Sequence, residues 1–320
     1  MGVSIFFIVI GLILLVKGAD FFVNGASSLA KRYNISELAI GLTVVAFGTS
    51  APEMIVNVVA SVQNHQEIVF GNIIGSNNFN LFIILGITGL ITPLVVQSQT
   101  AWKEIPFSFL AIVVLYFLVN DQLLGIVPAN MLSRIDGLVL LFFFGGFIYY
   151  IYRQLKIDKT TPVVTSKSMS NFKLWASISG GLLGLIIGGK LVVNYAVSLA
   201  QILHISEKII GLTIVAVGTS LPELSTSVVA ALKKNSDIAI GNIIGSNIFN
   251  ILLVLSASSL ARPISYNTTF NTDIYLLAGG TILLYLFMFS GGRKKLDRWE
   301  AGILFLIYLI YIWLVIIDKI

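Results

Sequence analysis

The chain has 320 residues, of which 57% are hydrophobic and only 11% are charged. A soluble domain carries about 25% charged residues, so this composition excludes an ordinary soluble fold. The formal net charge of +5 does not indicate a nucleic-acid partner, because the basic residues lie between apolar segments and not on one face. No cysteine is present, which excludes a disulfide framework and a thiolate metal site.

Apolar segments long enough to cross a membrane recur along the whole chain. A spanning helix needs about 20 mostly apolar residues, and an isolated strand cannot satisfy its backbone in hydrocarbon. The first segment lacks a basic start and a cleavage site, so we expect a retained helix and no signal peptide. The sequence predicts an all-α membrane protein whose ten spans lie near residues 3–23, 38–61, 67–91, 104–120, 135–153, 173–195, 208–231, 238–260, 272–290 and 299–317.

An internal repeat organises these spans. Residues 35–82 align with 205–252 without a gap, at a constant offset of 170, and roughly 27 of the 48 positions are identical. Each repeat holds an odd number of spans, so the second must enter the membrane from the opposite side, as in many secondary transporters. We therefore predict two inverted five-helix repeats at 1–153 and 173–320, joined by a link at 154–172.

Loop charges predict the orientation, because cytoplasmic loops carry an excess of lysine and arginine. With the N-terminus outside, the external loops keep only Arg134, Lys208, Arg262 and Lys319. The cytoplasmic loops then contain Lys31, Arg32, Lys103, Arg153, Lys156, Lys159, Lys167, Lys173, Lys233, Lys234, Arg293, Lys294, Lys295 and Arg298. We expect a multi-pass protein of the cell membrane with both termini extracytoplasmic and the link in the cytoplasm.

Two glutamates lie inside predicted spans, Glu53 at the end of GTSAPE and Glu223 at the end of GTSLPE. An ionised carboxylate in hydrocarbon is costly, so it is tolerated only where it faces a protein interior, a cavity or a cation. One such residue alone could be structural, paired to a lysine. Two at equivalent positions of inverted repeats predict a shared site near the middle of the bilayer.

The residues beside the glutamates indicate what this site binds. Pro52 and Pro222 remove a backbone donor, and Gly48 and Gly218 add flexibility, so each helix should break there. Non-helical backbone at this depth is tolerated where it lines a cavity. Carbonyls, hydroxyls and carboxylates suit Ca²⁺, Na⁺ and Mg²⁺ better than zinc or copper. The carbonyls that such a break would free are those of Ala46, Phe47, Thr49, Ala216, Val217 and Thr219.

A second motif pair, GNIIGSNNFN and GNIIGSNIFN, adds polar residues in the third and eighth spans. Ser76 and Asn80 are four residues apart and share one helix face, and Ser246 and Asn250 repeat the arrangement. Taken alone, these residues could be hydrogen-bonding packing contacts between helices. Beside the two glutamates, they predict a further layer of neutral ligands.

The charge of the predicted site indicates ion exchange. Two carboxylates balance one Ca²⁺ or two Na⁺, with neutral oxygens completing the six to eight ligands that calcium prefers. A site that balances either filling, but not both together, suits an antiporter. Left empty, it would hold two unpaired charges, which discourages the unloaded protein from changing its orientation.

These motifs make the sequence similar to the cation/calcium exchanger superfamily, and specifically to its sodium/calcium exchanger branch, over essentially the whole chain. The resemblance implies a ten-helix fold with an ion-binding core from the second, third, seventh and eighth helices, and exchange of three Na⁺ for one Ca²⁺. It implies a calcium site at Glu53, Glu223 and the backbone carbonyls of Thr49 and Thr219. It implies sodium sites at Ala46, Ser50, Ser76, Ala216, Ser220 and Ser246, with Asn80 and Asn250 bordering the centre.

The resemblance also implies no cofactor, since Na⁺ and Ca²⁺ are substrates, and no obligatory protein partner. It suggests that the glycine-bearing first and sixth spans slide across the core. Potassium-dependent members of the superfamily and several prokaryotic relatives have aspartate where this chain has Asn250, and from the asparagine we predict transport without a potassium requirement. In the first span, Asp20 lies one turn from Lys17, for which we expect a local ion pair or snorkelling.

Three other functions remain as alternatives. A calcium/proton antiporter on the same scaffold is the nearest, although the GTSxPE serines supply extra neutral ligands that favour sodium. An intramembrane enzyme is disfavoured, because the spans contain neither HExxH nor a nucleophile–histidine pair. A passive channel is disfavoured because the predicted site is acidic and enclosed, unlike a ring that lines a pore.

Overall fold

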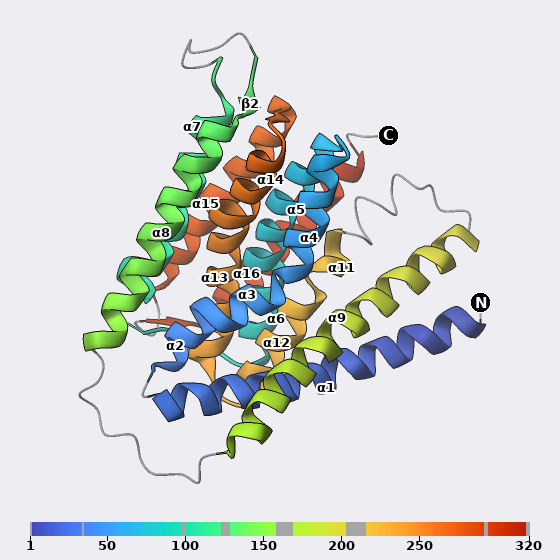
Figure 1. Cartoon of the computed structure of the whole chain (residues 1–320), viewed down its shortest axis with the longest axis vertical. Coiled ribbons are helices and arrows are strands. Elements are labelled where there is room, and N and C mark those ends of the chain that lie inside the picture. Colours follow the sequence, from blue (N-terminus) through green and yellow to red (C-terminus); the bar gives the residue numbers. More distant parts are fainter. Residues whose placement is uncertain are drawn as a thin grey trace. The chain divides into compact units, whose positions relative to one another are not determined.

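The computed structural model is helical almost throughout (Figure 1). The structure describes residues 2–33, 35–97, 100–122, 129–157, 169–202, 216–290 and 294–317. Eight helices in these ranges are long and apolar enough to cross a membrane, and a ninth span results if the bent pair Glu37–Thr49 and Ala51–Val62 is counted as one. The predicted seventh span begins at residues outside the described ranges, so the count of ten stays a prediction, as does the link at 154–172.

The two helices at the start of the predicted repeats are longer than expected. Helix α1 covers Gly2–Tyr33, ten residues beyond the predicted end at 23, and α9 covers Asn171–Ile202. The prediction stopped where the apolar run ends, but the helical backbone continues through the polar residues that follow. Both helices therefore extend past the apolar segments used to predict them.

Two compact units make up the described chain, and neither coincides with one repeat. The first comprises residues 1–55 and 145–246, and the second comprises 56–144 and 247–320. The chain passes from one unit to the other within α4 (Ala51–Val62), α8 (Arg134–Ile157) and α13 (Ser236–Phe249). The two units therefore share covalently continuous helices.

In the first unit, α1 and α9 lie side by side (Figure 1). Their backbones approach closely at glycines: a Cβ on Gly18 would lie 2.8 Å from Leu185 N, and one on Gly188 would lie 2.8 Å from Gly11 O. Small residues permit such contact between helices in membranes. Besides its parts of α4, α8 and α13, the unit includes α2 (Glu37–Ile40), the π-helix η1 (Gly41–Val45), α3 (Ala46–Thr49), α11 (Ala216–Thr219) and α12 (Leu221–Leu232).

In the second unit, α16 (Arg298–Ile317) packs on α6 (Leu85–Ile91), and α15 (Asn271–Phe287) packs on α7 (Ile105–Val119) and α5 (Gln66–Asn78). Gly280 permits a further contact of α15 with the segment that carries Phe82, since the Phe82 ring fills the position of an added Cβ. The remaining helical segments are η2 (Phe79–Ile84), η3 (Thr100–Glu104), η6 (Asn250–Val254), α14 (Leu255–Ala261) and η7 (Thr268–Phe270).

Four two-residue strands pair loops of the second unit. Strand β1 (Leu94–Val95) pairs antiparallel with β4 (Lys295–Leu296), and β2 (Met131–Leu132) pairs antiparallel with β3 (Ile264–Ser265). In each pairing the two loops lie on the same side of any membrane that the helices cross. These short ladders are the described exception to an all-helical chain.

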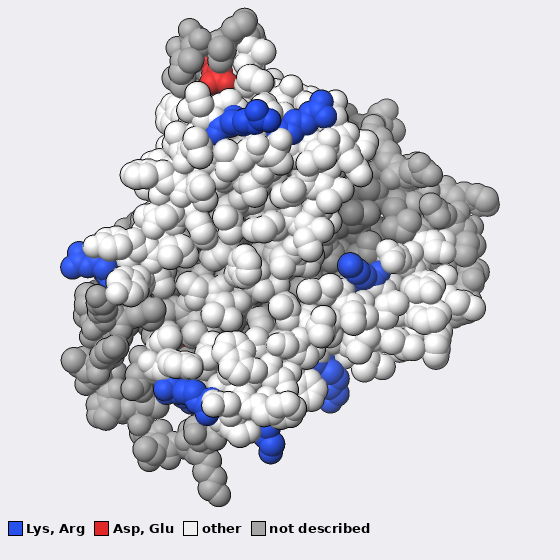
Figure 2. All heavy atoms as spheres, viewed as in Figure 1, with Lys and Arg blue, Asp and Glu red and all other residues white. Residues whose placement is uncertain are grey.

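Burial and surface composition fit a membrane protein. The spans Gln66–Ile91 and Ser236–Ala261 are 83% and 94% buried over their most apolar windows, whereas the other straight spans reach at most 39%. Figure 2 shows a face that is mostly uncharged, with lysine and arginine side chains in a few separate groups. Uncharged side chains exposed over such an area suit contact with hydrocarbon, so the two buried spans form the interior of a multi-pass membrane protein.

Candidate ion-binding site

Each GTSxPE motif breaks its helix, as the sequence predicts. Ser50 has φ −82° and ψ 4°, and Ser220 has φ −89° and ψ 5°, so neither continues the helix before it. At Ser50 the axes of the flanking helices bend by 47°. The proline of each motif then occupies the first turn of the next helix, where its missing N–H costs nothing.

Two of the carbonyls that the breaks were expected to free, those of Ala46 and Val217, accept hydrogen bonds within the chain. Ala46 O accepts hydrogen bonds from Ser50 N at 3.0 Å and from Thr49 Oγ1 at 3.3 Å, and Val217 O accepts from Ser220 N at 3.1 Å. The chain tightens into a turn at each serine, which satisfies these oxygens locally. The break therefore leaves fewer free carbonyls than the proline alone suggests.

Both glutamates are buried in the first unit. Glu53 lies in the first turn of α4 and Glu223 in the first turn of α12, and both are 0% exposed. Backbone N–H groups at a helix N-terminus and the positive end of the helix dipole favour a carboxylate there. Each serine break thus creates the helix start that carries an acidic side chain.

The two carboxylates face each other's motifs. Ser50 Oγ donates to Glu223 Oε1 at 3.0 Å, and Thr49 also lies near this carboxylate. In the reverse direction, Glu53 lies near the hydroxyls of Thr219 and Ser220 and within electrostatic range of Glu223. The structure therefore brings together residues 49, 50 and 53 with 219, 220 and 223 in a crossed arrangement that follows the sequence repeat.

Asn242 is a site residue that sequence reasoning missed. Its Oδ1 accepts from Thr49 Oγ1 at 3.0 Å, and its Nδ2 donates to Ser227 Oγ at 3.0 Å and to the Glu223 carbonyl at 3.3 Å. Its signal in the sequence is its place as the first asparagine of the second GNIIGSN motif, outside the serine and asparagine positions that share one helix face. Asn242 links the two GTSxPE breaks through groups other than the carboxylates.

The remaining candidate residues are divided between the units. Ala46 is fully buried in the first unit, Ala216 begins α11, and Ser246 lies near Glu223. Ser76, Asn80 and Asn250 belong to the second unit, where all three are at most 1% exposed. Asn80 lies within the π-helix η2, and Asn250 begins the π-helix η6. Such π segments are frequent at functional sites.

The first-unit cluster can hold a hard cation but resembles no transition-metal centre. Among the described residues, no group of three acidic, histidine or cysteine side chains could hold a metal. Two carboxylates, several hydroxyls and backbone oxygens therefore make up the available donors. Such oxygen donors suit Na⁺ and Ca²⁺.

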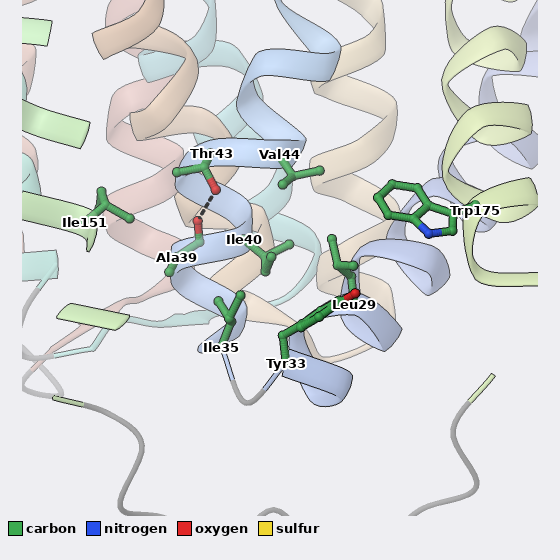
Figure 3. A pocket seen from close by; sticks show the side chains of 9 residues that line it. All are labelled: Leu29, Tyr33, Ile35, Ala39, Ile40, Thr43, Val44, Ile151 and Trp175. Atoms are coloured by element: carbon green, nitrogen blue, oxygen red, sulfur yellow. Dashed lines mark hydrogen bonds between the residues drawn. The ribbon is translucent and has the colours of Figure 1, made fainter. Parts of the chain in front are cut away.

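The first unit also contains a cavity of about 330 Å³ (Figure 3). Its lining is apolar except for the Thr43 hydroxyl, which donates to Ala39 O, and the Tyr33 and Trp175 rings. The lining residues are Leu29, Tyr33, Ile35, Ala39, Ile40, Thr43, Val44, Ile151 and Trp175. Among the described residues, the cavity lining contains no charged side chain.

Of the two expectations for Asp20, a local ion pair or snorkelling, the structure shows an ion pair, but with a residue outside the first span. Lys233 Nζ lies 2.7 Å from Asp20 Oδ1 and donates to Asn24 Oδ1 at 2.8 Å. Asp20 thus pairs with the residue that directly follows α12, and not with Lys17. The pair joins α1 to the helix that carries Glu223.

Comparisons with known proteins agree with this geometry. Residues 3–153 and 173–317 match the family described as sodium/calcium exchanger protein. The chain is 32% identical to the sodium/calcium exchanger MaX1 of Methanosarcina acetivorans, over 97% of both chains. It is 36% identical to the inner membrane protein YrbG of Escherichia coli, over 80% of this chain and 79% of that protein.

Solved structures of a sodium–calcium exchanger, NCX_Mj, match the fold. In the structure soaked with Na⁺ and Sr²⁺, the match has a TM-score of 0.82 and 33% sequence identity, and it covers 97% of this chain and 98% of that chain. The family match and the fold both describe cation/calcium antiporters and not enzymes. The chain therefore belongs to the sodium/calcium exchanger protein family.

Proposed function

We propose that this protein exchanges Na⁺ for Ca²⁺ across the membrane, with both ions binding at Glu53 and Glu223. The observation that carries the proposal is the crossed pair of buried carboxylates, each facing the hydroxyls of the other repeat's motif. Two buried carboxylates place a charge of −2 in the protein interior, and a bound cation neutralises that charge. One Ca²⁺ or two Na⁺ balance that charge equally, so the two ions compete.

The proposed calcium ligands are Glu53, Glu223 and the carbonyls of Thr49 and Thr219. The proposed sodium ligands add Ala46, Ser50, Ser76, Ala216, Ser220 and Ser246, and Asn80 and Asn250 provide neutral oxygens. A third Na⁺ accompanies the two that balance the carboxylates, so each cycle moves one net positive charge. Exchange is therefore electrogenic and responds to membrane potential.

We infer ten spans with both termini outside. Three described spans lie between β2 and β3, and an even number of crossings is required for these paired loops to meet on one side. A further crossing within the predicted seventh span meets that requirement. The same parity argument applies to β1 and β4. With these ten spans, the closely packed α1 and α9 supply the element that slides to alternate access.

The coupling ion distinguishes this proposal from a calcium/proton antiporter. The hydroxyls around each carboxylate favour Na⁺, since they are neutral oxygen ligands that a proton does not need. The neutral Asn250 supports transport without potassium. A severalfold rise in calcium flux on adding K⁺ would contradict that part of the proposal.

Calcium uptake into sodium-loaded proteoliposomes, diluted into sodium-free buffer, tests the site. We expect Glu53→Gln and Glu223→Gln each to abolish sodium-driven uptake, because a neutral amide cannot balance a divalent cation. Glu300→Gln is the matched control: Glu300 is also fully buried, but it accepts from Asp297 N at the start of α16. Loss of uptake in Glu300→Gln, or wild-type uptake in either site variant, would count against the proposed site.

A further inference from the structure

Four asparagines of the second unit form a closed set of hydrogen bonds, which we call the asparagine quartet. They are Asn77 and Asn80 of the first repeat and Asn247 and Asn250 of the second, and all are at most 4% exposed. Asn77 corresponds to Asn247, and Asn80 to Asn250, at the offset of 170 that relates the repeats. The quartet therefore consists of two repeat-related pairs.

Asn77 and Asn247 donate hydrogen bonds to each other's backbone carbonyls. Asn77 Nδ2 donates to the Asn247 carbonyl at 3.2 Å, and Asn247 Nδ2 donates to the Asn77 carbonyl at 3.3 Å. Each amide nitrogen is thus bonded to a backbone oxygen, so the orientation of each side-chain amide is fixed. As a consequence, Oδ1 of both residues must act as an acceptor.

The second pair is held by the first, across the repeats. Asn80 Nδ2 donates to Asn247 Oδ1 at 3.0 Å, and Asn250 Nδ2 donates to Asn77 Oδ1 at 3.0 Å. The remaining atoms, Oδ1 of Asn80 and Oδ1 of Asn250, are buried and accept no hydrogen bond from the described part of the chain. Buried polar atoms in native proteins almost always have a partner, so two repeat-related exceptions point to a ligand.

We propose that Asn77 and Asn247 are positioning residues for ion binding. Each fixes the side-chain amide of a ligand asparagine in the other repeat, so that the oxygen, and not the NH₂ group, stays available to a cation. This inference rests on the proposed function, in which Asn80 and Asn250 supply neutral ligands. It adds two residues that touch no ion. The orientation of Asn250 depends on Asn77, and the orientation of Asn80 depends on Asn247.

The quartet also determines which side chain fits at position 250. Asn77 Oδ1 is fixed as an acceptor, so its partner must donate. An amide at 250 donates, whereas an ionised carboxylate would place two acceptors against each other.

A double-mutant cycle tests the crossed dependence, because a residue that acts through another has no effect once that other is removed. The calcium KM is measured in sodium-loaded proteoliposomes for Asn77→Ala, Asn250→Ala and their combination. We expect each single variant to raise KM about tenfold, the size of one misplaced neutral ligand. The Asn77→Ala/Asn250→Ala variant should match Asn250→Ala within about twofold, whereas Asn77→Ala/Asn80→Ala should exceed both of its single variants.

The chain supplies a matched control. Asn78 is also buried in α5, donates to the Asp273 carbonyl at 3.0 Å and has an Oδ1 that accepts from no described donor. The second repeat has Ile248 at its position, so this oxygen has no repeat-related counterpart. We expect Asn78→Ile to leave the calcium KM unchanged. An unchanged KM in Asn77→Ala, or full multiplication of the effects in Asn77→Ala/Asn250→Ala, would overturn the proposal.

A second readout separates this proposal from the proposed function. The rise in melting temperature that Ca²⁺ produces in detergent reports binding without transport. If wild-type protein shows no sodium-driven uptake, the exchange proposal fails, and the same variants are compared by this calcium-dependent shift. The positioning role is supported if Asn77→Ala/Asn250→Ala has the same calcium-dependent shift as Asn250→Ala alone. It is rejected if the alanine variants at 77, 80, 247 and 250 all reduce this shift equally and each double variant shows the combined effect of its two substitutions.

Discussion

At the scale of single residues, Glu223 shows how the site is supported. Its carboxylate accepts from Ser50, and its backbone carbonyl accepts from Asn242, which also accepts from the Thr49 hydroxyl. The carboxylates could be predicted from sequence, since an acidic residue inside an apolar span is conspicuous. Asn242 could not, because a buried asparagine looks the same in sequence whether it supports a site or packs two helices.

Replacing Asn242 by leucine should weaken calcium binding without removing charge. The change removes the hydrogen bonds that Asn242 makes to the Thr49 and Ser227 hydroxyls and to the Glu223 carbonyl, each worth about 0.5–1.5 kcal/mol. We expect a lower melting temperature and a smaller calcium-dependent shift, measured by intrinsic tryptophan fluorescence in detergent. A calcium-dependent shift equal to that of the wild type would show that Asn242 does not support the site.

Asn250→Asp should reduce exchange even though it adds a possible cation ligand. An ionised aspartate cannot donate to Asn77 Oδ1, so two acceptors would face each other in a buried position. We expect at least about a tenfold fall in sodium-driven calcium uptake. Uptake at or above the wild-type rate would mean that the quartet tolerates a carboxylate here.

At the scale of elements, the helix breaks followed from the sequence and the π-helices did not. Glycine, serine and proline in GTSxPE predict a break because each acts on the local backbone. The π-helices η2 and η6 follow GNIIGSN motifs that have no glycine or proline at the transition. A π turn depends on the packing of neighbouring helices, which single-sequence patterns do not report.

Gly245 of α13 lies against Leu42 of η1 and Ala46 of α3, next to the GTSAPE break. A Cβ at this position would lie 2.8 Å from Ala46 Cβ and 2.9 Å from Leu42 O. We expect Gly245→Ala to push α13 from η1 and α3, lowering both the melting temperature and the calcium-dependent shift. Gly279→Ala, for which no described atom lies within 4 Å of the added Cβ, is the control and should change neither.

The loop after α7 gives a prediction for pH dependence. Burial raises the pKa of Asp121 above its ordinary value of 3.8, and nearby Asp136 raises it further, against the lowering effect of the Met131 N–H. The folded protein therefore holds this proton more tightly than the unfolded chain, and stability is lost as pH rises from 3.8 through the raised value. The Asp121→Asn variant has no carboxyl group to titrate at this position, so it does not show this loss of stability with rising pH.

We therefore expect the melting temperature of the wild type, relative to Asp121→Asn, to fall as pH rises through this window and to level off above it. Melting curves of both proteins in one detergent, from about pH 4 to about pH 8, provide the measurement. Two parallel curves would show that Asp121 has the same pKa in the folded and unfolded chains.

At the scale of the whole molecule, the repeat was the most informative feature of the sequence. The gapless alignment placed Glu53 with Glu223 and Ser50 with Ser220, and the structure brings these residues together. The division into compact units could not be predicted, because each unit combines segments of both repeats. Such long-range packing depends on which helices meet, and hydropathy patterns do not contain that information.

The proposed topology can be tested in a chain that contains no native cysteine. We expect Thr269→Cys, in an exposed segment predicted to be external, to react with a membrane-impermeant maleimide in intact cells. Ser170→Cys, at the exposed end of the link, should react only after the membrane is permeabilised. The reverse labelling pattern would invert the orientation, and labelling of both from outside would refute the predicted number of crossings.

The measurement that tests the central claim most directly is calcium uptake by wild-type proteoliposomes under two separate gradients. One set has an outward sodium gradient at equal pH, and the other has a pH gradient, acidic inside, without sodium. Both are held at the same membrane potential. The account predicts uptake under the sodium gradient alone, whereas uptake driven by the pH gradient without sodium would contradict sodium as the coupling ion.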